Sequence, residues 1–98
     1  MIVHLVRADW FHKFADNSTY ESETLHDEGF VHCSAPHQVG EIRERYFQGI
    51  KNLVVLVIDP YKVKAVLKYE PGFGGALFPH IYGPINKDAI GQILYLED

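Results

Sequence analysis

Apolar residues along the chain fall into short runs that are separated by turn residues. The run at residues 53–58 contains no polar position, which is typical of a central strand covered on both faces. Asp59-Pro60 ends this run. Other runs rich in β-branched and aromatic residues predict strands at residues 2–6, 30–34, 65–70, 77–82 and 92–96.

Helical patterns are found in the first half of the chain. Asp9 is a candidate cap for a helix over residues 7–14, and Gly29 stands where a short helix before it would end in a left-handed cap. A further helix is predicted to begin with Ser34 as its cap and to end at Gly49. Helices early and strands late predict an α+β fold, a single domain over residues 1–98 with a bent, mixed or mostly antiparallel sheet.

Strand alternation places several polar side chains on shared faces. His32 and Ser34 share a face with Phe30, and His80 and Tyr82 share a face with Phe78. If these faces meet that of His4, with Glu70 at the end of its strand, three imidazoles, two hydroxyls and a carboxylate would surround a groove walled by Phe30 and Phe78. Such a mixture suits a polar ligand held against an aromatic surface.

Each of these residues also has a purely structural interpretation. His4 would be a half-buried histidine bonded to a backbone carbonyl, and Ser34 would only cap a helix. Tyr82 would seal a sheet edge, and Glu70 would pair with Lys68. Pro79, inside a predicted strand, indicates an edge strand or a bulge.

Composition narrows the class of partner. A net charge of -4 over 98 residues does not favour long nucleic acids or anionic membranes. One cysteine cannot form an internal disulfide, no signal peptide is evident, and the longest apolar run is too short to cross a bilayer, so we expect a soluble cytoplasmic protein. No metal-binding spacing of histidines or cysteines is present, so we expect no metal.

Two motifs resemble a known family. Residues 28–34 read Glu-Gly-Phe-Val-His-Cys-Ser, and residues 78–84 read Phe-Pro-His-Ile-Tyr-Gly-Pro. With His4, Trp10 and Lys68-Tyr69-Glu70, they resemble the small bacterial "domain of unknown function 952" family over nearly the whole chain. That family has no established activity to carry over.

The resemblance implies a fold related to the ADP-ribosyltransferase superfamily, in which a split, strongly bent β-sheet cradles NAD. There a first-strand histidine commonly bonds the ribose beside the nicotinamide, and an aromatic residue stacks on the ring. His4 matches that histidine, and Phe78 or Tyr82 is the candidate aromatic residue. Leu5 follows His4 where many members have a glycine, and Glu70 lies earlier than the superfamily's late-strand glutamate.

Three hypotheses follow. The first is an enzyme that binds NAD or a related nucleotide and acts at the ribose, by ADP-ribosyl or 2′-phosphate transfer. Its candidate catalytic residues are His32, His80 and Glu70, and its candidate ligand-binding residues are His4, Ser34, Phe78 and Tyr82. The second is a non-catalytic module that binds a nucleotide-like or anionic metabolite in the same cleft. The third is a structural or partner-binding domain whose histidines satisfy the core.

Overall fold

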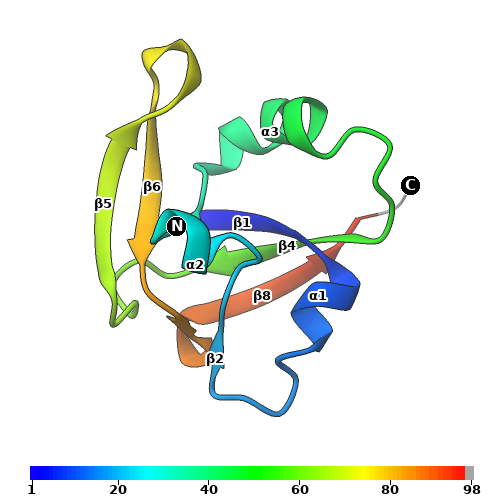
Figure 1. Cartoon of the computed structure of the whole chain (residues 1–98), viewed down its shortest axis with the longest axis vertical. Coiled ribbons are helices and arrows are strands. Elements are labelled where there is room, and N and C mark those ends of the chain that lie inside the picture. Colours follow the sequence, from blue (N-terminus) through cyan, green and yellow to red (C-terminus); the bar gives the residue numbers. More distant parts are fainter. Residues whose placement is uncertain (97–98) are drawn as a thin grey trace.

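The computed structural model describes residues 1–96, in which helices and strands combine in an α+β fold with three small sheets (Figure 1). Every strand pairing within these residues is antiparallel. The first sheet has the order β1 (Ile2–Arg7), β4 (Leu53–Ile58), β8 (Ile90–Tyr95), and the second has the order β3 (Val31–His32), β6 (Leu77–Tyr82), β5 (Val66–Pro71). The third sheet pairs β2 (Thr19–Tyr20) with β7 (Ile85–Asn86).

Strand β4 is the central strand that its apolar run predicts, with β1 on one side and β8 on the other. Because successive side chains alternate between faces, Val54, Leu56 and Ile58 enter the larger core. Leu53 and Val55 enter a smaller core on the opposite face. Both faces of the strand are therefore buried, so odd and even positions alike need apolar residues, and polar residues do not alternate with them.

The first two sheets are joined where β1 meets the residues after β3. Val3 and Ser34 exchange two backbone hydrogen bonds, of 2.8 and 2.7 Å. Beyond this junction the β5–β6 hairpin runs across the direction of β1, β4 and β8 (Figure 1). In place of the single bent sheet expected from the sequence, two separate sheets meet at this junction.

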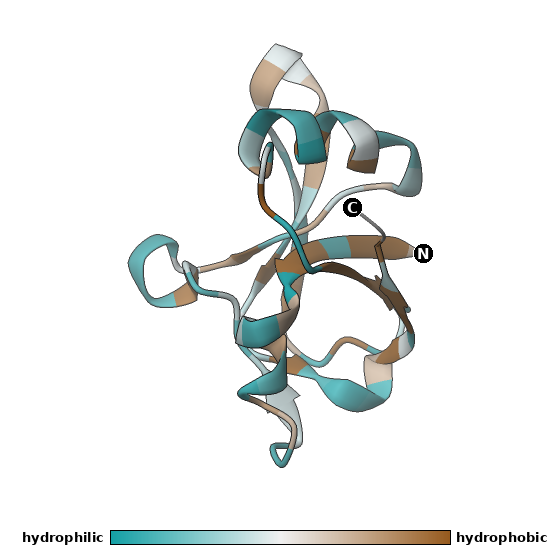
Figure 2. Ribbon diagram, turned by 90° about the vertical axis from the view of Figure 1, so that its right-hand side faces the viewer, coloured by the Kyte–Doolittle hydropathy of each residue, from teal (hydrophilic) through white to brown (hydrophobic). Residues whose placement is uncertain are grey.

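The helices are shorter than predicted. They are α1 (Ala8–His12), α2 (Leu25–Glu28) and α3 (Val39–Tyr46), with 3-10 turns at Pro36–Gln38, Phe73–Gly75 and Lys87–Ala89. Gly29 is the left-handed cap of α2, with φ 84°, as predicted. Figure 2 shows hydrophobic residues along the strands of the first sheet and many hydrophilic residues on the helices. No helix among residues 1–96 is long and apolar enough to cross a membrane.

Two predictions about helix starts are wrong. Ala35, not Ser34, precedes the turn that leads into α3, and the Ala35 N–H donates to the Gln38 side chain at 2.8 Å. The backbone N–H and carbonyl of Ser34 instead bond Val3 of β1. Ser34 lies before the cap position, and its hydroxyl caps no helix. Asp9 lies in the first turn of α1, and Arg7 occupies the cap position.

The expectation of an edge strand or a bulge at Pro79 is also wrong, because β6 is the centre of its sheet and its register with β5 has no shift. The Cys33 N–H donates to the Pro79 carbonyl at 3.0 Å, but proline has no N–H with which to return the bond. The ladder between β3 and β6 therefore ends at this residue. A buried proline is tolerated in the central strand because its neighbour on that side stops there.

Candidate ligand-binding site

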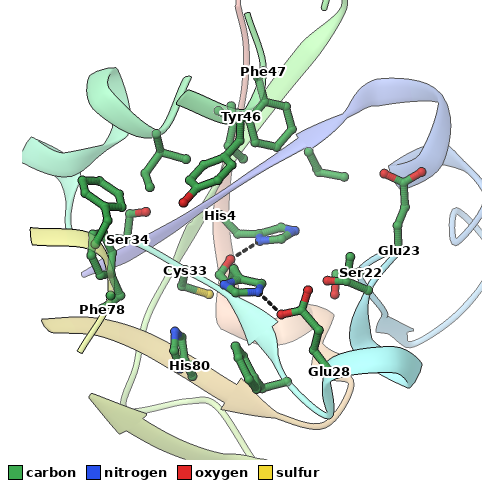
Figure 3. A pocket seen from close by; sticks show the side chains of 18 of the residues that line it. His4, Ser22, Glu23, Glu28, Cys33, Ser34, Tyr46, Phe47, Phe78 and His80 are labelled. Atoms are coloured by element: carbon green, nitrogen blue, oxygen red, sulfur yellow. Dashed lines mark hydrogen bonds and ion pairs between the residues drawn. The ribbon is translucent and has the colours of Figure 1, made fainter. Parts of the chain in front are cut away.

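A cavity of about 550 Å³ lies where the two larger sheets bend toward each other (Figure 3). Its walls come from β1, from residues 20–34, from α3 and from the tip of the β5–β6 hairpin. Five of the residues predicted for a site line it, namely His4, His32, Ser34, Phe78 and His80. Glu70 and Tyr82 do not line it. Instead they touch one another and His80.

His32 and His80 are cross-strand partners on β3 and β6, and their ring centroids are 5.3 Å apart. The Phe30 ring stacks on His80 with a centroid distance of 4.1 Å and meets the edge of His32 at 4.7 Å. The two predicted faces therefore converge, and Phe30 holds both imidazoles in place from one side.

His80 is oriented by Glu70. The Nδ1 atom of His80 lies 2.8 Å from Glu70 Oε1, and the Tyr82 hydroxyl donates to the same oxygen. The hydrogen bond from Tyr82 and that from His80 hold the pKa of the Glu70 carboxyl below its usual range. Since an ionised carboxylate only accepts, Nδ1 of His80 carries the proton, and Nε2 is left as the acceptor.

His32 is also paired with a carboxylate. Its Nε2 atom bonds Glu28, the last residue of α2, at the mouth of the cavity. The two side chains are 54% and 41% exposed, so the pair contributes little to stability. Its effect is to direct one imidazole nitrogen toward the carboxylate and to leave Nδ1 for other contacts.

His4 has both ring nitrogens occupied within the protein. Nδ1 donates to the His32 carbonyl at 2.6 Å, and Nε2 accepts from the Tyr20 hydroxyl at 2.8 Å. Burial lowers the pKa of His4 to about 4, so the ring is neutral at neutral pH. This geometry matches the structural interpretation of His4 given above, a buried histidine bonded to a backbone carbonyl.

Two buried hydroxyls line the cavity. Ser22 Oγ is buried and has no hydrogen-bond partner among the described residues. Ser34, which also lines the cavity, is only 6% exposed. A buried hydroxyl without a partner costs about 1–3 kcal/mol, so the Ser22 hydroxyl is suited to bonding a ligand in the cavity.

Aromatic rings form the wall nearest α3 and the hairpin tip. Phe73 packs on Phe78 with centroids 5.2 Å apart and lies 6.4 Å from Tyr46. The Arg45 guanidinium covers the Phe73 ring at 4.0 Å, on the side of α3. These contacts connect the hairpin tip to α3 across the cavity.

The described residues of the cavity include one cysteine, Cys33. Cys33 is 3% exposed, and burial raises the pKa of its thiol, which keeps it protonated and unreactive. Within residues 1–96, no group of three or more histidine, cysteine or acidic side chains is arranged to hold a metal ion.

Residues 5–93 match the model of the family described as "Protein of unknown function (DUF952)". The chain belongs to this family. It is 29% identical to protein CC0527 from Caulobacter crescentus, whose crystal structure superposes with a TM-score of 0.90 over 98% of this chain and 85% of that one. The solution structure of CC0527 gives 28% identity and a TM-score of 0.77, over 98% and 84% of the two chains. The comparison with curated proteins found no match.

Several cavity residues of this DUF952 chain carry no clear signal in the sequence. Glu28 stands four residues before His32, but only the turn at Gly29 brings them together. Ser22 and Tyr20 lie in irregular sequence, where no periodicity indicates which way a side chain points. The predicted part of the DUF952 site is the part that lies on strands.

Proposed function

We propose that the cavity binds a small molecule with a planar ring and ribose-like hydroxyls, and that His32 and His80 transfer protons on it. The observation that carries this proposal is the pair of imidazoles, 5.3 Å apart, each held by its own carboxylate at an aromatic-walled cavity. Histidine is the side chain best suited to general acid–base catalysis near neutral pH.

The two histidines take complementary roles in this proposal. Nε2 of His80, whose side chain is 10% exposed, accepts the proton of a water or acceptor hydroxyl that attacks C1′ of the ribose, and Glu70 stabilises the imidazolium that forms. The bond from C1′ to the planar ring breaks in the same step, and the ring leaves with the electron pair of that bond. His32, which neighbours His80 and is nearer to solvent, passes that proton on to water. Glu70 acts through His80 and is a positioning residue, since it lies outside the cavity wall.

NAD is the candidate ligand that the family resemblance supplies, on an ADP-ribosyltransferase-like fold. Support comes from the two sheets joined at Val3 and Ser34, and from the position of His4 on β1 beside that junction. In this arrangement the nicotinamide riboside half lies in the cavity, with its ring against Phe78 and its hydroxyls toward Ser34 and His32. The net charge of -4 still argues against long RNA as a substrate.

A second candidate function is a binding module without catalysis. It is favoured by His4, whose two nitrogens are already bonded to the His32 carbonyl and to Tyr20 and are therefore not free for a ribose. In that case His32 and His80 would bond the ligand without moving its protons.

An NMR titration separates these functions. Isotopically labelled protein is titrated with NAD and with nicotinamide riboside, and backbone and imidazole signals are followed to about millimolar ligand. We expect saturable shifts at His32, His80 and Phe78, with loss of binding in His32→Ala and His80→Ala. His37→Ala, an exposed histidine outside the cavity, is the matched control.

The same samples are then incubated and analysed by chromatography for ligand cleavage. Cleavage that disappears in both cavity variants supports the enzyme. Binding without any product supports the module. Signals that do not move with either ligand contradict both functions.

A further inference from the structure

The cavity wall carries negative and neutral groups. No lysine or arginine among residues 1–96 lines it, whereas Glu23 and Glu28 both do. His4 is neutral there, because burial lowers its pKa to about 4. Arg7 forms an ion pair with Glu23, and Arg45 covers the Phe73 ring, but neither arginine lines the cavity.

The hydrogen-bonding groups in the wall are mostly acceptors or hydroxyls. Glu28 presents carboxylate oxygens, His80 presents Nε2, and Ser22 presents a buried hydroxyl without a partner among the described residues. These groups bond the hydroxyls and amino groups of a ligand well. An ionised phosphate has no proton to donate and carries about two negative charges, and no lysine or arginine lines this wall to balance them.

We infer that the cavity selects an unphosphorylated nucleoside over the nucleotide that carries a phosphate on the same ribose. This inference rests on the proposed function, because it names the ligand class of the same cavity. It also means that a dinucleotide would place its diphosphate outside, with only its terminal nucleoside between Phe78 and His80. Sites that hold phosphate inside usually supply arginine, lysine or a helix N-terminus for it.

The test compares nicotinamide riboside with nicotinamide mononucleotide, two probes that differ by one phosphate. Dissociation constants are measured by NMR titration at low salt and about pH 8, where the phosphate is fully ionised. We expect the riboside to bind about tenfold more tightly, as like charges at short range and low salt imply. Glu28→Gln should reduce this ratio severalfold by removing one of the repelling charges.

Glu44→Gln is the matched control, since Glu44 is an exposed carboxylate of α3 that does not line the cavity. It should leave the ratio unchanged. Equal or tighter binding of the mononucleotide, or the same ratio in Glu28→Gln as in the wild type, overturns this inference while the proposed function stands. Failure of both probes to bind overturns the proposed function and this inference together.

Discussion

The Nδ1 atom of His80 lies 2.8 Å from Oε1 of Glu70, and this contact connects the cavity wall to the open face of the β5–β6 hairpin. The Tyr82 hydroxyl donates to the same oxygen, so one carboxylate orients two side chains. Without Glu70 the imidazole would be free to turn over or to change the nitrogen that carries its proton. The relationship therefore bears both on acid stability and on any chemistry at Nε2.

Glu70→Gln should make the stability of the protein less sensitive to acid. The pKa of Glu70 is held below its ordinary 4.5, first by Tyr82 and then by His80. A depressed carboxyl pKa stabilises the folded state above the unfolded pKa, and this stabilisation is lost as pH falls through the folded pKa. Thermal unfolding at about pH 7 and about pH 3 should show a smaller loss for Glu70→Gln than for the wild type.

Glu44→Gln serves as the control for that experiment, because it removes an exposed carboxylate that bonds neither His80 nor Tyr82. It should lose as much stability on acidification as the wild type does. An identical acid response in the Glu70 and Glu44 variants would show that the Glu70 contacts do not survive in solution.

His4 should make the protein less stable as pH falls from about 6.5 to about 4. Its pKa is lowered from 6.5 to about 4 by burial, so the unfolded state binds a proton in this range and the folded state does not. The stability that His4 contributes is fully present above pH 6.5 and is lost as pH approaches 4. The full loss corresponds to roughly 3 kcal/mol.

Urea unfolding at about pH 7.5 and about pH 5 measures this effect. His4→Gln should be less stable than the wild type at the higher pH, because the bonds to Tyr20 and the His32 carbonyl are weakened. Its stability should change less between the two pH values. If the stability of His4→Gln fell with pH as much as that of the wild type, the loss of stability would have to come from another group.

The predicted parts of the site are those on regular strands. Side chains alternate between the two faces of a strand, which tells which residues share a face with His32 on β3 and with His80 on β6. Antiparallel pairing of the two strands then makes these histidines neighbours. The central place of β4 follows in the same way from its unbroken apolar run. These features depend only on the alternation of side chains along a strand and on the burial of apolar residues, and both can be predicted from the order of polar and apolar residues.

The remaining parts depend on contacts between distant segments. Ser22 is buried, and no pattern among its neighbours in the sequence indicates this. β2 and β7 have two residues each, too few to show any alternation. The sequence predicts an edge strand or a bulge at Pro79, because a missing N–H usually excludes a regular central strand. The early end of β3, which removes that conflict, appears only in the fold.

Ser34 and Gln38 should respond in opposite ways to replacement by alanine. Ser34→Ala should change the free energy of unfolding by less than about 0.5 kcal/mol, because its hydroxyl caps no helix. Gln38→Ala should cost about 1 kcal/mol, because it removes the acceptor for the Ala35 N–H and the bond to the Leu77 carbonyl. Denaturant unfolding of both variants measures this.

In ligand titration, Ser34→Ala should have the larger effect of the two variants. Ser34→Ala should weaken the binding of nicotinamide riboside, because the hydroxyl faces the cavity, whereas Gln38 lies outside the cavity wall. A loss of stability in Ser34→Ala as large as that in Gln38→Ala would restore the capping role that the sequence suggests for Ser34.

Gly72→Ala should disturb the aromatic wall of the cavity. A Cβ atom on Gly72 would lie 2.4 Å from Cδ2 and 2.6 Å from Cε2 of Phe78, so the buried ring must move. Overpacking of this kind typically costs about 1–3 kcal/mol, and the displaced ring should also weaken ligand binding. Gly40→Ala is the control, since a Cβ there meets nothing within 4 Å inside α3 and should raise stability by about 0.5–1 kcal/mol. If Gly72→Ala left both the unfolding free energy and the titration unchanged, the hairpin tip would have to sit farther from Phe78 in solution than these distances imply.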